Sequence, residues 1–280
     1  MNAQLSLLMY ILILAGIDGQ FDWFNIWLAQ MDRYNDMCNG MKQSPIPLLS
    51  AGSLPPAGIQ PLEFLGYEQD PIHVSVINDG HTVVFMFQYP YTQHIIAQGG
   101  PLRGRFRFAS LHFHWGASSE RGAEHVVDGF RYSMEMHLVF FNEMYGSFLE
   151  ARDQPNGLSV LGVFFHSMPT GVYYGWVPAL GMVQYPKTSF ALPDPSVFNI
   201  QELIGSMREP YFSYRGSLTT PPCSETVTWI VQKRPLAISE EQLGFFRMLQ
   251  DEHGQPMVDN YRALQHANGR IPNLYRQSLW

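Results

Sequence analysis

Positive charge is scarce in this sequence. Its 280 residues include 17 Lys and Arg against 24 Asp and Glu, which gives a formal net charge of −7 at pH 7. A protein that binds nucleic acid needs a positive surface to neutralise the phosphates. The composition therefore argues against nucleic acid as a partner.

Long apolar runs are also missing, with one short exception near the start. Leu5–Ala15 is almost entirely apolar, but it has only about half of the ~20 residues that a membrane-spanning helix requires. Small residues follow it, as they do at the cleavage site of a secretory signal, although no Lys or Arg precedes it. We expect a cleaved signal peptide over about residues 1–19 and a secreted, extracellular protein of residues 20–280 with no membrane anchor. A buried N-terminal helix is the alternative.

Cysteine occurs only twice, at Cys38 and Cys223. In an exported chain the simplest interpretation is one disulfide. Two unrelated buried thiols become the better interpretation if the N-terminal segment is not a signal. No Asn-x-Ser/Thr sequon is present, so N-glycosylation is not expected.

Short segments rich in β-branched and aromatic residues recur between turn-forming residues. Those that fit strands are 72–77, 82–88, 105–115, 132–141, 158–165 and 226–232. Helical signals are few: a weak one at 147–152, and Ser239 followed by Gln242 as in a capping box. The pattern predicts one mainly β (α+β) domain, built on a large twisted, mostly antiparallel sheet with short peripheral helices.

Two histidines on one predicted strand are the first chemical signal. His112 and His114 alternate with Phe113, so both point to the same face. By itself this pattern more often marks polar residues on a half-exposed strand. Glu135 and His137 share a face of the next predicted strand, and a short connection favours antiparallel neighbours. Three imidazoles can then hold a tetrahedral zinc with one open position, as catalytic zinc sites do, while Glu135 accepts the far N–H of His137.

A rigid loop carries two hydroxyls beside two prolines, at residues 217–222 (SLTTPP). Zinc lowers the pKa of its water to ~7, and the hydroxide must then be oriented. A Thr hydroxyl can accept from that hydroxide while it donates to a carboxylate, for which Glu124 is the candidate. Taken alone, the segment is more often a structural turn.

Together these segments resemble an α-class carbonic anhydrase of the secreted type. The motifs that match occur in the family's order over about residues 38–262. They are QSPI (43–46), NDGH (78–81), HFHWG (112–116), EMH (135–137), SLTTPP (217–222) and VDNYR (258–262). The resemblance implies the family's fold. It also implies reversible hydration of carbon dioxide to bicarbonate and a proton by zinc-bound hydroxide, with carbon dioxide and bicarbonate as the small-molecule partners.

The resemblance also implies roles for single residues. Zinc is held by His112, His114 and His137, and Thr219 bonds to Glu124. The carbonyl of Asn260 orients His114. The implied substrate pocket consists of Val139, Val160, Leu218, Thr220, Val227 and Trp229.

Two further matches lie outside the zinc ligands. His81 matches the family's proton shuttle, although its turn context alone favours a solvated histidine. Cys38 and Cys223 match the disulfide of the secreted members.

The sequence departs from the family pattern at two positions in the implied cavity. Ser110 stands where the family usually has a glutamine that holds the first zinc ligand, and a serine is too short to reach as an amide does. Val84 replaces a polar residue. Both changes weaken the expected water path to His81. A catalytically weak or non-catalytic binding protein of the same fold is the alternative function, although such relatives usually have a broken ligand set and this chain does not. Ester hydrolysis by the same zinc site is a third.

Overall fold

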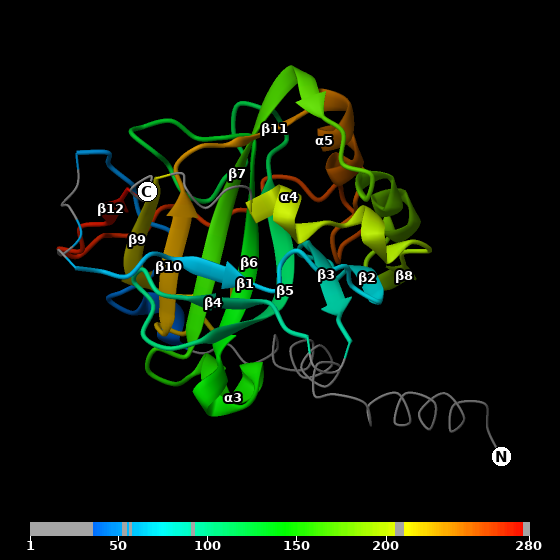
Figure 1. The fold of residues 1–280 in the computed structure, drawn as a ribbon. Coiled ribbons are helices and arrows are strands. Elements are labelled where there is room, and N and C mark those ends of the chain that lie inside the picture. The colour runs from blue at the N-terminus through cyan, green and yellow to red at the C-terminus, as the bar shows by residue number, and fades with distance from the viewer. Residues whose placement is uncertain (1–35, 52–54, 56–57, 91–92, 205–209, 277–280) are drawn as a thin grey trace.

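The computed structural model describes residues 36–51, 55, 58–90, 93–204 and 210–276. These residues form a twelve-stranded sheet with short helices around it (Figure 1). In chain order the strands are β1 (Glu63–Leu65), β2 (His73–Asn78), β3 (Val83–Gln88), β4 (Ile96–Gln98), β5 (Phe106–Trp115), β6 (Met134–Asn142), β7 (Leu158–Val172), β8 (Thr188–Ala191), β9 (Tyr211–Gly216), β10 (Val227–Gln232), β11 (Leu236–Ile238) and β12 (Asn273–Tyr275).

The main path of the sheet runs β12-β9-β10-β7-β6-β5-β3-β2-β8, and β1, β4 and β11 join it at the side. Most neighbouring pairs are antiparallel, whereas β7 pairs in parallel with both β10 and β11. The predicted fold class is confirmed. The predicted segments do not include β1, β4, β8, β9, β11 or β12, and β7 continues to Val172, well past the predicted end at residue 165.

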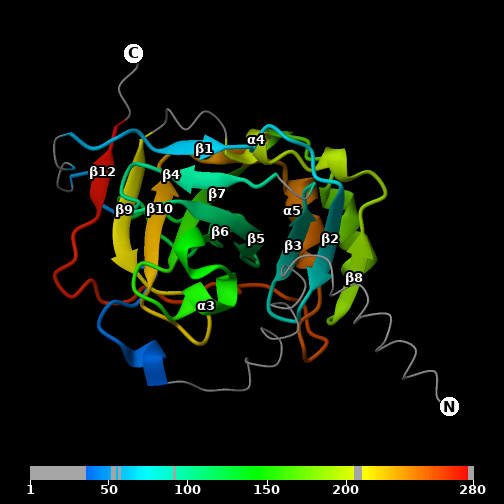
Figure 2. The ribbon, with the colours of Figure 1, turned by 60° about the horizontal axis from the view of Figure 1, so that its bottom comes forward.

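Helices lie at the periphery of the sheet (Figure 2). They are α3 (Phe148–Arg152), α4 (Ile200–Ile204) and α5 (Glu240–Arg247), with the 3₁₀ helices η1 (Asp36–Asn39), η2 (Glu143–Tyr145), η3 (Val177–Val183) and η4 (Pro195–Val197). Ser239 caps α5 by accepting from the N–H of Gln242, so the predicted cap is present. Ser147 caps α3 in the same way.

One face of the central strands packs in the apolar core, and the other face carries the predicted zinc ligands. On β5 and β6 the residues Phe113, Trp115 and Met136 belong to a large apolar core beneath η3, α4 and α5. The alternate residues His112, His114 and Glu135 point to the opposite face. Each fully buried Phe side chain contributes about 1.5–3 kcal/mol to folding, so the core face holds the strands on which the histidines stand.

Strand register brings the three histidines together. In the antiparallel β5–β6 pair, His112 lies directly opposite His137, and His114 lies opposite Glu135. On the other side of β5, Val84 of β3 lies opposite His112. A slip of one residue in either pair would turn these side chains to the other face.

Cys38 and Cys223 form a disulfide, so the predicted pairing is confirmed. It joins the start of the described chain to the loop that follows Thr219, across a sequence separation of 185 residues. The predicted signal peptide, residues 1–19, lies outside the described residues. Within the described ranges, no helix is long and apolar enough to cross a membrane.

Candidate metal centre and catalytic cavity

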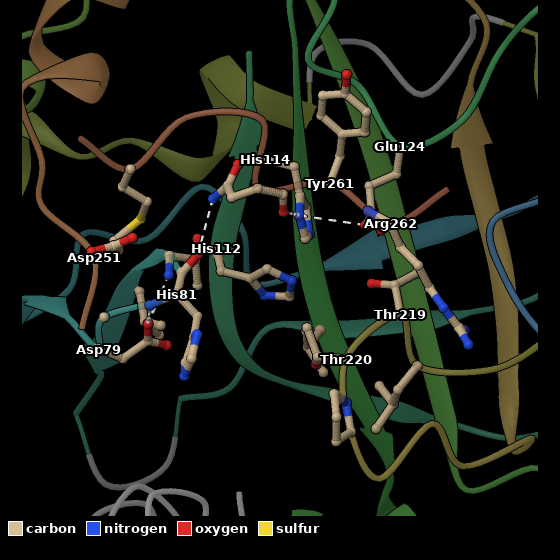
Figure 3. A pocket seen from close by; sticks show the side chains of 18 of the residues that line it. Asp79, His81, His112, His114, Glu124, Thr219, Thr220, Asp251, Tyr261 and Arg262 are labelled. Carbon is tan, nitrogen blue, oxygen red and sulfur yellow. Dashed lines mark hydrogen bonds and ion pairs between the residues drawn. The ribbon is translucent and has the colours of Figure 1, made fainter. Parts of the chain in front are cut away.

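Three imidazole nitrogens converge between β5 and β6 (Figure 3 shows His112 and His114). Nδ1 of His137 lies 3.1 Å from Nε2 of His114 and 3.3 Å from Nε2 of His112. In a tetrahedral zinc site with Zn–N bonds of 2.0–2.1 Å, neighbouring nitrogens are about 3.3 Å apart. The spacing of the three nitrogens therefore fits the ligand set of one zinc ion.

The hydrogen bonds of two ligands fix which nitrogen carries a proton. Nδ1 of His114 donates to the carbonyl of Asn260 at 2.9 Å, and Nε2 of His137 donates to Oε1 of Glu135 at 2.8 Å. In the neutral rings the inner nitrogens therefore present lone pairs to one another at 3.1 Å. Facing lone pairs repel unless a cation lies between them, so the donor chemistry also fits a metal.

Burial lowers the pKa of His112 well below its ordinary value, and the nearby rings of His137 and His114 lower it further. Burial also lowers the pKa of His137. Both rings are therefore neutral at pH 7, which is the form that binds a metal.

Glu135 is the centre of a buried network that the sequence did not reveal. Its Oε2 accepts from the backbone N–H of His125 at 2.8 Å, and its Oε1 lies 2.7 Å from Nδ1 of His125. Nε2 of His125 lies 2.7 Å from the Tyr214 hydroxyl, which donates to Ser44 at 3.0 Å. Neither His125 nor Tyr214 stands in a local pattern that predicts this contact, because Tyr214 comes from β9, 89 residues away.

The network keeps Glu135 ionised. Burial raises the pKa of Glu135, but the charge of His125 and the hydrogen bonds from His125 and His137 outweigh it and hold that pKa well below the usual range. A buried carboxylate with these donors is well placed to fix the His137 ring and to balance the charge of a cation.

His112 lacks the support that the other two ligands have. Among the described residues, no hydrogen bond joins Ser110 to His112, although both line the same cavity. Ser110 is buried, and Val84 adds an apolar surface beside it. The first ligand is therefore held by its strand and by packing rather than by a hydrogen-bond acceptor.

Thr219 and Glu124 line the cavity, but no hydrogen bond joins them within the described part of the chain. Glu124 is 1% exposed, and its Oε1 accepts from the backbone N–H of Arg262 at 2.8 Å. Its Oε2 is buried and has no hydrogen-bond partner among the described residues. A rotation of the Thr219 hydroxyl is the simplest way to satisfy that acceptor.

The cavity has a volume of about 580 Å³ and is lined by both polar and apolar residues. The polar ones include Asp79, His81, Thr82 and Thr220, and the apolar ones include Val139, Phe148, Leu218, Pro221 and Pro222. Val160, Val227 and Trp229, which the resemblance assigned to the substrate pocket, are buried and are not among the residues that line this cavity. The Trp229 ring instead packs 4.8 Å from the ring of His137, measured between centroids.

His81 stands at the rim of the cavity, in the turn between β2 and β3 (Figure 3). Asp79 holds this turn, because its Oδ1 accepts from the backbone N–H groups of His81 and Thr82, each at 2.7 Å. Asn260 Nδ2 donates to the carbonyl of His81 at 3.1 Å. Asn260 therefore contacts both the His81 turn and the ligand His114.

Three histidines that leave one side of a metal open to a cavity are the arrangement of a catalytic zinc protein. The family model for eukaryotic-type carbonic anhydrase matches residues 24–273. The chain is 39% identical to carbonic anhydrase 7 of Mus musculus and to carbonic anhydrase 7 of Homo sapiens, each over 91% of this chain and 93% of the relative. It is 34% identical to carbonic anhydrase 3 of Mus musculus, over 84% of this chain and 90% of the relative.

The chain therefore belongs to the eukaryotic-type carbonic anhydrase family. Zinc is the metal that this family uses, and the group of His112, His114 and His137 could hold it.

The turn that carries His81 yields a pH-dependent stability prediction. Burial raises the pKa of Asp79 to about 6 from an ordinary value of 3.8, against the lowering effect of the hydrogen bonds from Thr82 and His81. Because the folded protein binds this proton more tightly than the unfolded chain, stability falls as pH rises from about 4 to about 6. Asp79→Asn removes the buried charge and should raise the free energy of unfolding at pH 7.5 by about 1–3 kcal/mol.

Urea unfolding of the wild type and the Asp79→Asn variant checks this prediction. The difference in the free energy of unfolding between Asp79→Asn and the wild type should decrease as pH falls from about 6 toward 4, where the wild-type carboxyl is protonated. Asp194→Asn is the control, because the exposed Asp194 accepts from Ser196 and gains nothing from neutralisation. An Asp79→Asn protein no more stable than the wild type at pH 7.5 would contradict the burial argument.

Proposed function

We propose that this protein catalyses the reversible hydration of carbon dioxide to bicarbonate and a proton. The observation that carries the proposal is the convergence of three imidazole nitrogens, with separations of 3.1 and 3.3 Å, beside a cavity lined by both polar and apolar residues. Membership of the carbonic anhydrase family supports the same reaction. The apolar lining residues suit carbon dioxide, and the polar ones suit water and the departing bicarbonate.

Different residues of the chain have different roles in this proposed reaction. His112, His114 and His137 would hold a zinc ion, which would act as the Lewis acid that makes water nucleophilic at neutral pH. Glu135 and the carbonyl of Asn260 keep His137 and His114 in the tautomers that bind it. We assign Val139 and Leu218, with Thr220 beside them, to the part of the cavity that receives carbon dioxide.

Thr219 orients the attacking water in this proposal. Its hydroxyl would turn to donate to Oε2 of Glu124, which has no hydrogen-bond partner among the described residues, so that only the lone pairs of the hydroxyl face the cavity. The attacking water must then donate to Thr219, which points one of its own lone pairs toward carbon dioxide. His81 at the rim takes up the released proton and passes it to buffer.

The hydration reaction is tested by stopped-flow measurement on the purified protein. We expect a chelator to abolish hydration and added zinc to restore it. His112→Ala should lose zinc and lower the rate by about 10³-fold or more, whereas His266→Ala, an exposed histidine outside the cavity, should match the wild type. Full zinc content and full rate in His112→Ala would remove the ligand assignment. Stoichiometric zinc without hydration in the wild type would favour the non-catalytic binding protein.

The role of Thr219 has a separate test. Thr219→Ala should keep its zinc but lose about 10²- to 10³-fold in kcat, because the attacking water loses its acceptor. Thr219→Ser keeps the hydroxyl and should retain most of the rate. Both variants are compared by stopped-flow hydration and by metal analysis. Equal rates for Thr219→Ala and the wild type would discard the orienting role.

We also propose that the protein is secreted, with a signal peptide over about residues 1–19. Two observations support this: the short apolar segment Leu5–Ala15 and the disulfide between Cys38 and Cys223. Disulfides persist in oxidising compartments and are rare in the cytosol. The bridge ties the start of the described chain to the Thr219 loop, so an oxidising compartment also suits the site.

Expression of the full chain in cultured eukaryotic cells tests secretion. We expect the protein in the medium, with an N-terminus near residue 20. A non-reducing peptide map should show one disulfide-linked pair of peptides, which contain Cys38 and Cys223. The chain retained in the cytosol with its first residues intact and both thiols free would contradict the proposal.

A further inference from the structure

The loop that follows α5 is attached to the turn that carries His81. The backbone N–H of Glu252 donates to the carbonyl of Gly80 at 3.1 Å. Gly80 has a φ of +95°, and a Cβ there would lie 3.2 Å from the Cβ of Glu252. The two segments are therefore in close contact, and the glycine makes room for the glutamate.

The same loop has a well-defined backbone. Oδ1 of Asp251 accepts from the N–H groups of His253 and Gln255, at 2.9 and 2.8 Å. The N–H of Asp251 donates to the carbonyl of Gln255 at 2.8 Å. These bonds fix where the side chains of Glu252 and His253 begin, while their ends reach solvent.

Glu252 lies between two imidazoles. Its Oε2 is 3.7 Å from Nε2 of His81, and its Oε1 is 3.6 Å from Nε2 of His253. The side chains are 42% exposed for His81, 47% for Glu252 and 77% for His253. Each distance exceeds a hydrogen bond by less than 1 Å, which a small rotation of such exposed side chains can close.

We propose that Glu252 and His253 extend the proton path beyond His81, from the cavity rim to solvent. The inference rests on the proposed function, in which His81 collects the proton released by hydration. His81 takes that proton on one ring nitrogen and releases one from Nε2 to the carboxylate of Glu252. Glu252 passes a proton to Nε2 of His253 or to water, and each group returns to its starting charge.

The geometry favours Glu252 over the other acid near the shuttle. Asp79 also lies beside His81, but its Oδ1 accepts from backbone N–H groups rather than from the ring. Within the described residues, Glu252 is the carboxylate in ion-pair reach of the His81 imidazole. Since an exposed ion pair adds little to stability, removal of Glu252 should change proton transfer rather than folding.

The test compares Glu252→Gln with the wild type in stopped-flow hydration at low and high buffer concentration. At low buffer, where proton release limits turnover, we expect kcat to fall about threefold or more while kcat/KM stays unchanged, because the carbon dioxide step is untouched. A high concentration of imidazole buffer should restore kcat. Glu252→Asp should recover part of the loss, and His253→Asn should lower kcat less than Glu252→Gln does.

Matched controls separate this effect from general charge removal. Glu202→Gln neutralises an exposed acid on α4, outside the cavity, and His266→Asn replaces an exposed histidine. Both should match the wild type at every buffer concentration. The double variant His81→Ala/Glu252→Gln should be no slower than His81→Ala alone, because Glu252 acts through His81.

The possible outcomes separate the proposed path through Glu252 and His253, here called the relay, from the shuttle role of His81 on which it rests. If His81→Ala keeps the full kcat at low buffer, the shuttle assignment of His81 is wrong and the relay fails with it. If His81→Ala loses kcat and imidazole restores it, but Glu252→Gln matches the wild type, the shuttle stands and the relay is overturned. A Glu252→Gln variant that loses kcat/KM as much as kcat would show a structural effect and would also overturn the relay.

Discussion

The structure depends above all on the register between β5 and β6. With His112 directly opposite His137, two ligands from different strands meet on one face, while Phe113 and Met136 enter the core on the other. The apolar core thus fixes the metal geometry indirectly, because a strand cannot shift without exposing that core. Packing on one side of the sheet and metal binding on the other are set by the same pairing.

Buried polar groups position the ligand side chains that the strand register brings together. Glu135 joins His137 to His125, and His125 continues to Tyr214 on β9. In this network the Glu135 carboxylate, both ring nitrogens of His125 and the Tyr214 hydroxyl all have hydrogen-bond partners, as a low-dielectric interior favours. His112 stands apart, since Ser110 makes no hydrogen bond to it within the described residues. We infer that the first ligand is the one whose position depends most on strand packing.

Local patterns in the sequence predict the strands and caps near the site well. Alternation places His112 and His114 on one face, and Ser239 with Gln242 marks the start of α5. The same patterns cannot predict contacts made across long sequence separations. His125 with Tyr214, and Glu252 with His81, are 89 and 171 residues apart, and only the three-dimensional fold joins them. The resemblance, rather than any local pattern, assigned Val160, Val227 and Trp229 to the substrate pocket, and that role stays a prediction, since all three are buried and none is among the residues that line the cavity.

Asn260 touches two functional elements at once. Its carbonyl accepts from the ligand His114, and its side chain donates to the carbonyl of His81. A coupling between His114 and the turn through Asn260 is reciprocal, so each partner then affects the other by the same free energy. We expect Asn260 to link metal loading to the rigidity of the β2–β3 turn in this way. Hydrogen exchange in that turn should report how fully the centre is loaded, although the turn contributes no ligand.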